Sequence, residues 1–196
     1  MMIEFEYPQG ATPVDADEAE GLLLTHITTR EELNRWEQDN ILAAKDWIKR
    51  SGPSDVLSEE FIKTLHKQMF GKVWKWAGQF RKSNKNLGCE WYQIPMTLRS
   101  LCEDTRLWIN EDDDSPDMIA VRFHHRLVSI HPFPNGNGRH AREVANLLLT
   151  NMLDHHPLTW GGDSLSTAND ARDRYIKALQ AADQGDYDPL LAFVRT

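Results

Sequence analysis

Residues 131–142 read HPFPNGNGRHAR, and we expect this stretch to join two helices of the fold. Gly136 and Gly138 permit backbone conformations that are closed to other residues and let a ligand come close to the main chain. A helix is expected to begin at about Gly138 and to cover Arg139 to Leu153. Its unpaired N–H groups and the positive end of its dipole would then point into the loop. A helix start of this kind is typical of a phosphate-binding site.

Four side chains of this stretch support the same interpretation. Asn137 can add an amide donor, while Arg139 and Arg142 lie three residues apart and share one helix face. Two arginines on one face can hold a polyphosphate together. His131 lies just ahead of them, and histidine is the side chain best suited to accept a proton near neutral pH. A base beside a phosphate site indicates phosphoryl or nucleotidyl transfer.

Simpler interpretations exist for parts of the stretch. Asn-Gly pairs are frequent in turns, and a histidine at a helix end often serves as a cap. Phe133 is expected to be a core residue that anchors the loop. His124 and His125 are expected to be partly exposed helix residues. With His131 they would form a metal cluster, but no HExxH motif and no carboxylate at ligand spacing accompany them.

Outward from the loop, the chain is predicted to be mainly α-helical. Thr29 and Glu32 have the spacing of a capping box, Ser58 precedes two glutamates, and Ser115-Pro116 is typical of a helix start. Residues 72–95 lack a helical period, so they are predicted to form a loop or a short β-hairpin. Residues 1–28 are predicted to be an irregular arm, followed by one domain over 29–196. The expected helices cover residues 29–50, 58–71, 96–110, 116–130, 139–153 and 169–182.

Composition excludes several classes of function. The 196 residues are 40% hydrophobic and 27% charged, which is typical of one soluble globular domain. The net charge of −8 gives no attraction to nucleic acid or anionic lipid, and a DNA-binding regulator would need a basic face. No stretch is typical of a leader or a membrane span, so a cytoplasmic location is expected. Cys89 and Cys102 are expected to be reduced thiols.

The stretch from His131 to Arg142 resembles the signature of the Fic family. That signature is histidine, any residue, Phe, any residue, an acid, Gly-Asn-Gly-Arg, two residues and Arg. Trp76 to Arg81 resembles the Fic stretch before the substrate-aligning flap, and Tyr175 to Leu190 is similar to the usual Fic tail. Nearly all of residues 30–194 is covered. With the arm from Pro13 to Thr29, the chain most resembles the Fic subgroup called mobile mystery protein B.

The resemblance implies a Fic-type helical bundle with a β-hairpin flap and a protein adenylyltransferase activity. His131 would deprotonate a Ser, Thr or Tyr hydroxyl of a target protein or of the chain itself. That hydroxyl would attack the α-phosphorus of ATP, and pyrophosphate would leave with Mg²⁺. The flap, at about Ser83 to Tyr92, would hold an extended target segment by backbone pairing. The resemblance also assigns the anion hole to Gly136, Asn137 and Gly138, the inner phosphates to Arg139, and the γ-phosphate to Arg142.

Asn135 departs from the signature, which has Asp or Glu at this position to hold the metal. An amide oxygen can bind Mg²⁺, but it brings no charge to a cation that prefers carboxylate and phosphate oxygens. Two alternatives therefore stay open. One is a weak or silent module that binds nucleotide or a partner protein, and the other is transfer of a different group. The Doc branch, which phosphorylates, lacks the Gly-Asn-Gly pattern, so AMP transfer is favoured.

The helix that opens at Thr29 is a candidate inhibitory helix, because Fic proteins often carry one whose glutamate pairs with the second arginine of the signature. The candidate glutamate is Glu37, which would pair with Arg142. The usual inhibitory pattern is degenerate here, since Leu33 and Gln38 replace its flanking residues. A solvated Glu37 that pairs along its own helix is the alternative.

Overall fold

The mainly α-helical fold is confirmed, and the computed structural model describes residues 15–53, 55–111, 113–162, 165 and 170–196. Its longer helices lie close to the expected ranges, although helix α6 begins two residues earlier than predicted. The elements are α1 (Ala16–Ala19), α2 (Arg30–Ser51), α3 (Glu59–Phe70), the 3-10 helix η1 (Trp91–Gln93), α4 (Ile94–Glu111), α5 (Pro116–Ile130), α6 (Asn137–Met152), α7 (Asp170–Ala182) and α8 (Asp188–Val194).

The capping residues determine where three of these helices begin. Thr29 Oγ1 accepts a hydrogen bond from the Glu32 amide, and the Glu32 carboxylate accepts one from the Thr29 amide, which completes the capping box. The Ser58 hydroxyl accepts from the Phe61 amide at the start of α3, and the Ser115 hydroxyl accepts from the Met118 amide at the start of α5. Each such cap contributes about 1 kcal/mol of helix stability. These local contacts explain why the helix starts can be predicted from sequence.

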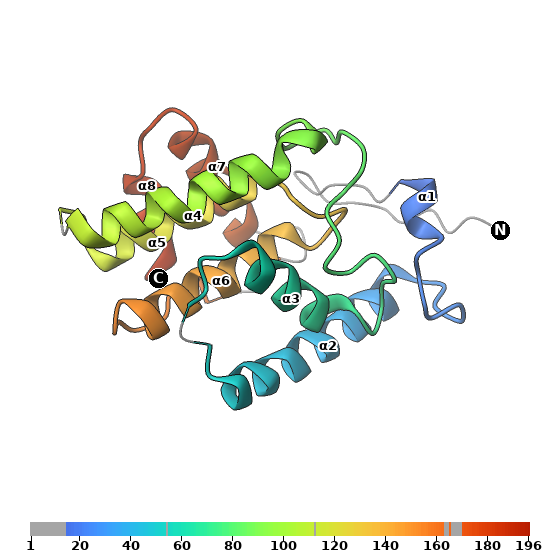
Figure 1. Ribbon diagram of the computed structural model, residues 1–196. Helices are drawn as coiled ribbons and strands as arrows, with labels where there is room; N and C mark the ends of the chain where they lie inside the picture. Colours follow the sequence, from blue (N-terminus) through green and yellow to red (C-terminus); the bar gives the residue numbers. More distant parts are fainter. Residues whose placement is uncertain (1–14, 54, 112, 163–164, 166–169) are drawn as a thin grey trace.

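Helix α5 is central to the bundle, where it packs against α4, α6 and α8 (Figure 1). Helices α2 and α3 form a second pair, which contacts the centre through α3 and α6. Phe70, Phe123 and Phe133 are fully buried between these helices. Burying a phenylalanine side chain contributes about 1.5–3 kcal/mol, so these contacts stabilise the ends of α3 and α5 that face the 131–142 loop.

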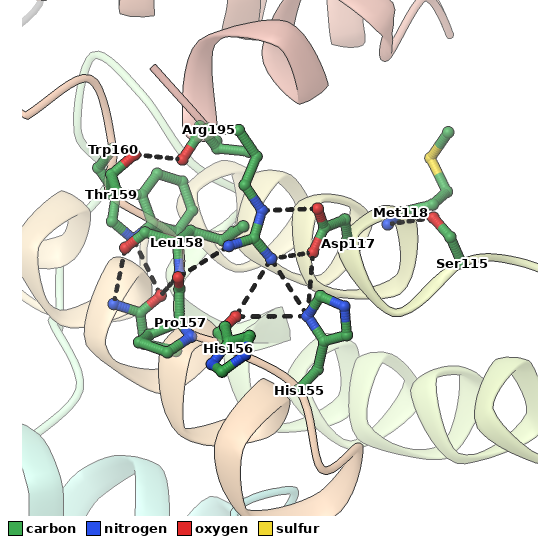
Figure 2. Close-up of polar contacts among 12 residues, drawn as sticks. Ser115, Asp117, Met118, His155, His156, Pro157, Leu158, Thr159, Trp160 and Arg195 are labelled. Carbon is green, nitrogen blue, oxygen red and sulfur yellow. Dashed lines mark hydrogen bonds and ion pairs between the residues drawn. The ribbon is translucent and has the colours of Figure 1, made fainter.

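The C-terminus is anchored to the start of α5 by the side chain of Arg195 (Figure 2). Its guanidinium pairs with both carboxylate oxygens of Asp117 and donates to the carbonyl of Pro157 at 2.9 Å. The amides of Thr159 and Trp160 donate to the carbonyl of Val194. Because α8 is fixed in this way and packs on α7, α7 is held beside the central helices.

The arm is more ordered than predicted over its described part, which begins at Asp15. It contains the one-turn helix α1, and Leu22 forms an isolated antiparallel bridge with Trp74. Lys85 pairs with Asp15 and Glu18 at 2.5 Å each. The arm is therefore attached to the connection between α3 and α4, which is drawn in green in Figure 1. The predicted arm residues 1–14 lie outside the described part.

The β-hairpin flap predicted over Ser83 to Tyr92 is wrong for this structure, because these residues form bends and turns that lead into η1. Their backbone groups bond to partners other than a facing strand. The amide of Trp91 donates to the Asn84 side chain at 3.0 Å, and the carbonyls of Ser83 and Cys89 accept from Arg81. We call residues 83–92 the flap segment from here on.

Candidate active site

The start of helix α6 forms one wall of a pocket, as the sequence predicts. Its N-cap, Gly136, has φ 81°, and a Cβ there would lie 2.7 Å from Phe70, so only glycine fits. A Cβ on Gly138 would lie 3.6 Å from the guanidinium of Arg142, which leaves this turn open toward the pocket. The N–H groups of the first turn and the helix dipole favour an anion at this place.

The loop before α6 is braced from within and from α3. The Asn137 side chain accepts from the amide of Phe133 at 2.9 Å and donates to its carbonyl at 2.8 Å. It is buried, so its main effect in this structure is on the loop shape, whereas the sequence led us to expect an anion donor. His66 on α3 accepts from the amide of Gly78 through Nδ1, so Nε2–H donates to the carbonyl of Asn135 at 3.0 Å.

His66 is a residue that sequence reasoning missed. It is fully buried and stacks on Phe133, with ring centroids 3.7 Å apart. Burial lowers its pKa well below the ordinary value, and the positive charge of Arg139 acts in the same direction. A neutral ring can accept from Gly78 and donate to Asn135 at the same time, whereas a protonated ring can only donate. No motif at His66 signals this role.

Glu37 pairs with Arg139, so the predicted pair between Glu37 and Arg142 is wrong. The Glu37 Oε2 atom accepts from Arg139 Nη1 at 2.7 Å, and Oε1 accepts from the indole of Trp74 at 2.7 Å. Glu37 is 2% exposed, so the solvated alternative is wrong as well. Two donors, the guanidinium of Arg139 and the indole of Trp74, thus hold this carboxylate.

Arg142 instead lies beside Tyr175 of α7, with its guanidinium 5.6 Å from the ring centroid. The Tyr175 hydroxyl also contacts Nε2 of His124 at 2.8 Å. Burial lowers the pKa of the Arg142 guanidinium below its ordinary value. Helix α7 therefore fixes the direction of the second arginine.

His131 lines the same pocket and ends helix α5 in the left-handed conformation, with φ 53°. Burial lowers its pKa to about 4, and the positive charges of Arg81 and Lys85 act in the same direction. The ring is therefore neutral near pH 7, which is the form that can accept a proton. A bound triphosphate would bring negative charge and raise this pKa toward the range in which a general base is effective.

The pocket is more positive than the net charge of the chain suggests. Arg30 of α2 and Arg172 of α7 line it together with Arg139 and Arg142. Among the described residues that line it, none is a carboxylate, and Glu37 does not reach it. An apolar side is formed by Val128, Leu165, Ile176 and Leu179. Sequence reasoning missed Arg30 and Arg172, although Arg172 lies three residues before Tyr175 on one helix face.

Asn135 lies at the rim of the pocket, where its Oδ1 atom accepts from the amide of Gly136 at 2.7 Å. A metal bound to this oxygen would share it with that hydrogen bond, because an amide oxygen has two lone pairs. Within the described part of the chain, no cluster of three or more His, Cys, Asp or Glu side chains is arranged to hold a metal. The protein thus offers Mg²⁺ one neutral oxygen at this position, which is a weak ligand set.

His124 and His125 are buried, contrary to the prediction that they are partly exposed. His124 contacts Tyr175, while His125 Nε2 pairs with Asp183 at 2.8 Å. They serve to pack α7 and its C-terminal turn on α5. Cys89 and Cys102 are free thiols, as predicted. In the described residues, no helix has the length and apolar character needed to cross a bilayer.

Comparisons with known proteins point to one family. Residues 56–149 match the model of the Fic/DOC family. The chain is 29% identical over 145 residues to the protein adenylyltransferase Fic of Aedes aegypti, and 30% identical over 144 residues to that of Drosophila melanogaster. These alignments cover 72% and 71% of this chain but 28% and 27% of the two relatives. The chain thus spans less than a third of their length.

Solved structures show the same fold. Fic-1 from C. elegans superposes with a TM-score of 0.62 at 24% identity, over 80% of this chain and 46% of that chain. BepC from Bartonella tribocorum, with bound AMPPNP, superposes with a TM-score of 0.68 at 18% identity, over 96% and 93% of the two chains.

Proposed function

We propose that the chain, which matches the Fic/DOC family model over residues 56–149, is a protein adenylyltransferase that transfers AMP from ATP to a hydroxyl of a target protein. One observation carries the proposal. His131, the open start of α6 and four arginines line one pocket whose described lining holds no carboxylate. Such a pocket favours a polyphosphate, and the neutral imidazole supplies a base at its edge.

The proposed reaction assigns one role to each of these groups. His131 takes the proton of a Ser, Thr or Tyr hydroxyl, on another protein or on the chain itself. The hydroxyl oxygen forms a bond to the α-phosphorus, and the bond from that phosphorus to the bridging oxygen breaks. Pyrophosphate carries away the electron pair of that bond. N–H groups of Gly136, Asn137 and Gly138 at the helix start stabilise the charge on the transferred phosphoryl group.

The two arginines of the loop divide the phosphates between them. Arg139, fixed by Glu37 at one nitrogen, lies on the first turn of α6 and holds the inner phosphates. Arg142 lies one turn further on, beside Tyr175, and reaches the γ-phosphate. The apolar side of the pocket then receives the nucleoside.

Mg²⁺ would bind chiefly through phosphate oxygens, with Asn135 as its protein ligand. It would supply charge neutralisation for the leaving pyrophosphate. Because the Asn135 oxygen is neutral and already bonded to the Gly136 amide, the weak ligand set supports a second candidate function. That candidate is a Fic module that binds nucleotide, or a partner protein, with little or no turnover.

Glu37 is proposed to be a brace, a residue that holds Arg139 in place and so supports transfer. A brake, in contrast, would lower transfer. A brake would compete with the nucleotide for an arginine, whereas Glu37 is not among the residues that line the pocket and is held by Trp74 as well. The sequence of the arm supports placement in the mobile mystery protein B subgroup.

Transfer of label from ATP tests the proposal directly. Purified protein and a cell lysate are incubated with ATP labelled at the α-phosphate, and in parallel with ATP labelled at the γ-phosphate. AMP transfer predicts protein labelling from the α-label alone, which His131→Ala removes. Labelling from the γ-label would indicate phosphorylation, and binding of ATP without either label would indicate the silent module.

A further inference from the structure

Arg81 connects the flap segment to the backbone around His131. Its guanidinium donates to the carbonyl of His131 at 2.7 Å and to that of Ser83 at 2.8 Å. The third guanidinium nitrogen, Nη2, donates to the carbonyls of Cys89 and Ile130. Its own amide donates to the carbonyl of Pro132 at 3.0 Å. One side chain, 2% exposed, thus joins both ends of the flap segment to the residues on either side of the base.

The backbone of His131 needs such support. A left-handed backbone with φ 53° is unfavourable for a non-glycine residue and persists when its surroundings fix it. The hydrogen bond from the charged, buried guanidinium of Arg81 to the His131 carbonyl is such a fixed contact. This bond therefore helps to hold the backbone conformation that sets the direction of the His131 ring.

Gly88 shows how closely the flap segment lies against the base. A Cβ at Gly88 would lie 2.6 Å from a guanidinium nitrogen of Arg81 and 2.7 Å from the Cβ of His131. The amide of the next residue, Cys89, donates to the carbonyl of Ile130 at 3.4 Å. The flap segment and the base are therefore in direct contact, and a shift of one moves the other.

We propose that Arg81 is a positioning residue, which holds His131 and both ends of the flap segment in the one geometry that permits transfer. The proposal rests on the proposed adenylyltransferase function. Arg81 bonds to backbone carbonyls of the flap segment and of residues 130–132, so its effect on the bound nucleotide is indirect. It should therefore affect the rate of transfer more than the affinity for ATP.

Arg81→Lys is the main test, because lysine keeps the charge but cannot reach carbonyls in three directions. We expect kcat to fall by about 10²-fold, as for a small displacement of a reacting group, with KM for ATP changed by less than about twofold. Arg81→Gln should lower kcat at least as far. Parental kcat in Arg81→Lys, or a loss that appears entirely in KM, would overturn the proposal.

Titration of the His131 ring by NMR gives a readout that does not depend on activity. The charged groups around His131 and its pocket are Arg81 and Lys85 on the flap side, Arg30 on α2, Arg139 and Arg142 on α6, and Arg172 on α7. Removing the Arg81 charge should raise the pKa of His131, and more in Arg81→Gln than in Arg81→Lys. An unchanged pKa of His131 in Arg81→Gln would refute the contact between Arg81 and His131. If the parent transfers no AMP, the proposed function fails while this titration still tests Arg81.

Gly88→Ala provides a second variant. It keeps Arg81, but the added methyl group would push the flap segment away from His131. Gly52→Ala is the matched control, because Gly52 also has a positive φ, of 54°, but a Cβ there would meet nothing within 4 Å. We expect Gly88→Ala to lose transfer activity while remaining folded, and Gly52→Ala to keep it. Equal kcat in the two alanine variants would contradict the proposed coupling.

Discussion

Replacing Glu37 by glutamine tests whether this carboxylate is a brace or a brake. In the folded protein its two oxygens accept from two fixed donors, Arg139 and Trp74, each at 2.7 Å. The amide of glutamine has one oxygen, so one donor must lose its partner and face an N–H group instead. If the oxygen stays with Trp74, the charged bond to Arg139 is lost.

The expected loss follows from these contacts. A hydrogen bond to a charged group contributes about 1.5–3 kcal/mol, and a buried donor left without a partner costs about 1–3 kcal/mol. The Arg139 side chain is 22% exposed, so water compensates part of this loss and the lower half of the range applies. We expect Glu37→Gln to lower the free energy of unfolding by about 2 kcal/mol, which for a chain of this length lowers Tm by about 4–8 °C.

Thermal unfolding followed by circular dichroism measures this change, and labelling from α-labelled ATP measures the activity. Because the brace holds Arg139, transfer should fall in Glu37→Gln and in Glu37→Gly. Glu31→Gln is the matched control, since Glu31 is exposed on the same helix. An unchanged Tm together with a rise in transfer in Glu37→Gly would refute the brace and restore the inhibitory role.

Three further predictions follow from the site. His131→Ala should reduce AMP transfer by about 10²–10⁴-fold and leave the circular dichroism spectrum unchanged; transfer at the parental rate would remove the base from the reaction. Asn135→Asp should raise activity at limiting Mg²⁺ because it adds the missing charge, and an unchanged Mg²⁺ requirement would show that residue 135 is not a ligand. The folded pKa values of His124 and His140, about 3, and of His131, about 4, lie below the ordinary 6.5, so the unfolded chain binds more protons between these limits. These histidines should therefore lower stability as the pH falls from 6.5 toward 4, by about 1.4 kcal/mol per pH unit each, and His140→Gln should reduce that slope in urea unfolding by one histidine.

The sequence by itself determines the helices and the chemistry of the loop. Caps such as Thr29 with Glu32 act within four residues, and the spacing of apolar residues along a helix is local as well, so both can be read from the sequence. The pattern from His131 to Arg142 also places a base beside a phosphate-binding helix start, because adjacent residues of one loop must lie together. The predicted helices agree with the structure, and His131 and the start of α6 line one pocket.

The tertiary structure alone decides which distant polar groups meet. Glu37 and Arg139 are 102 residues apart, and which arginine the carboxylate reaches depends on how α2 packs against α6. A hairpin would have paired the carbonyls of Ser83 and Cys89 with a facing strand, but here they accept hydrogen bonds from Arg81. The local sequence does not show this competition. His66 braces the loop from another helix. Buried polar groups must find partners, but the packing of the whole chain determines which partners are within reach.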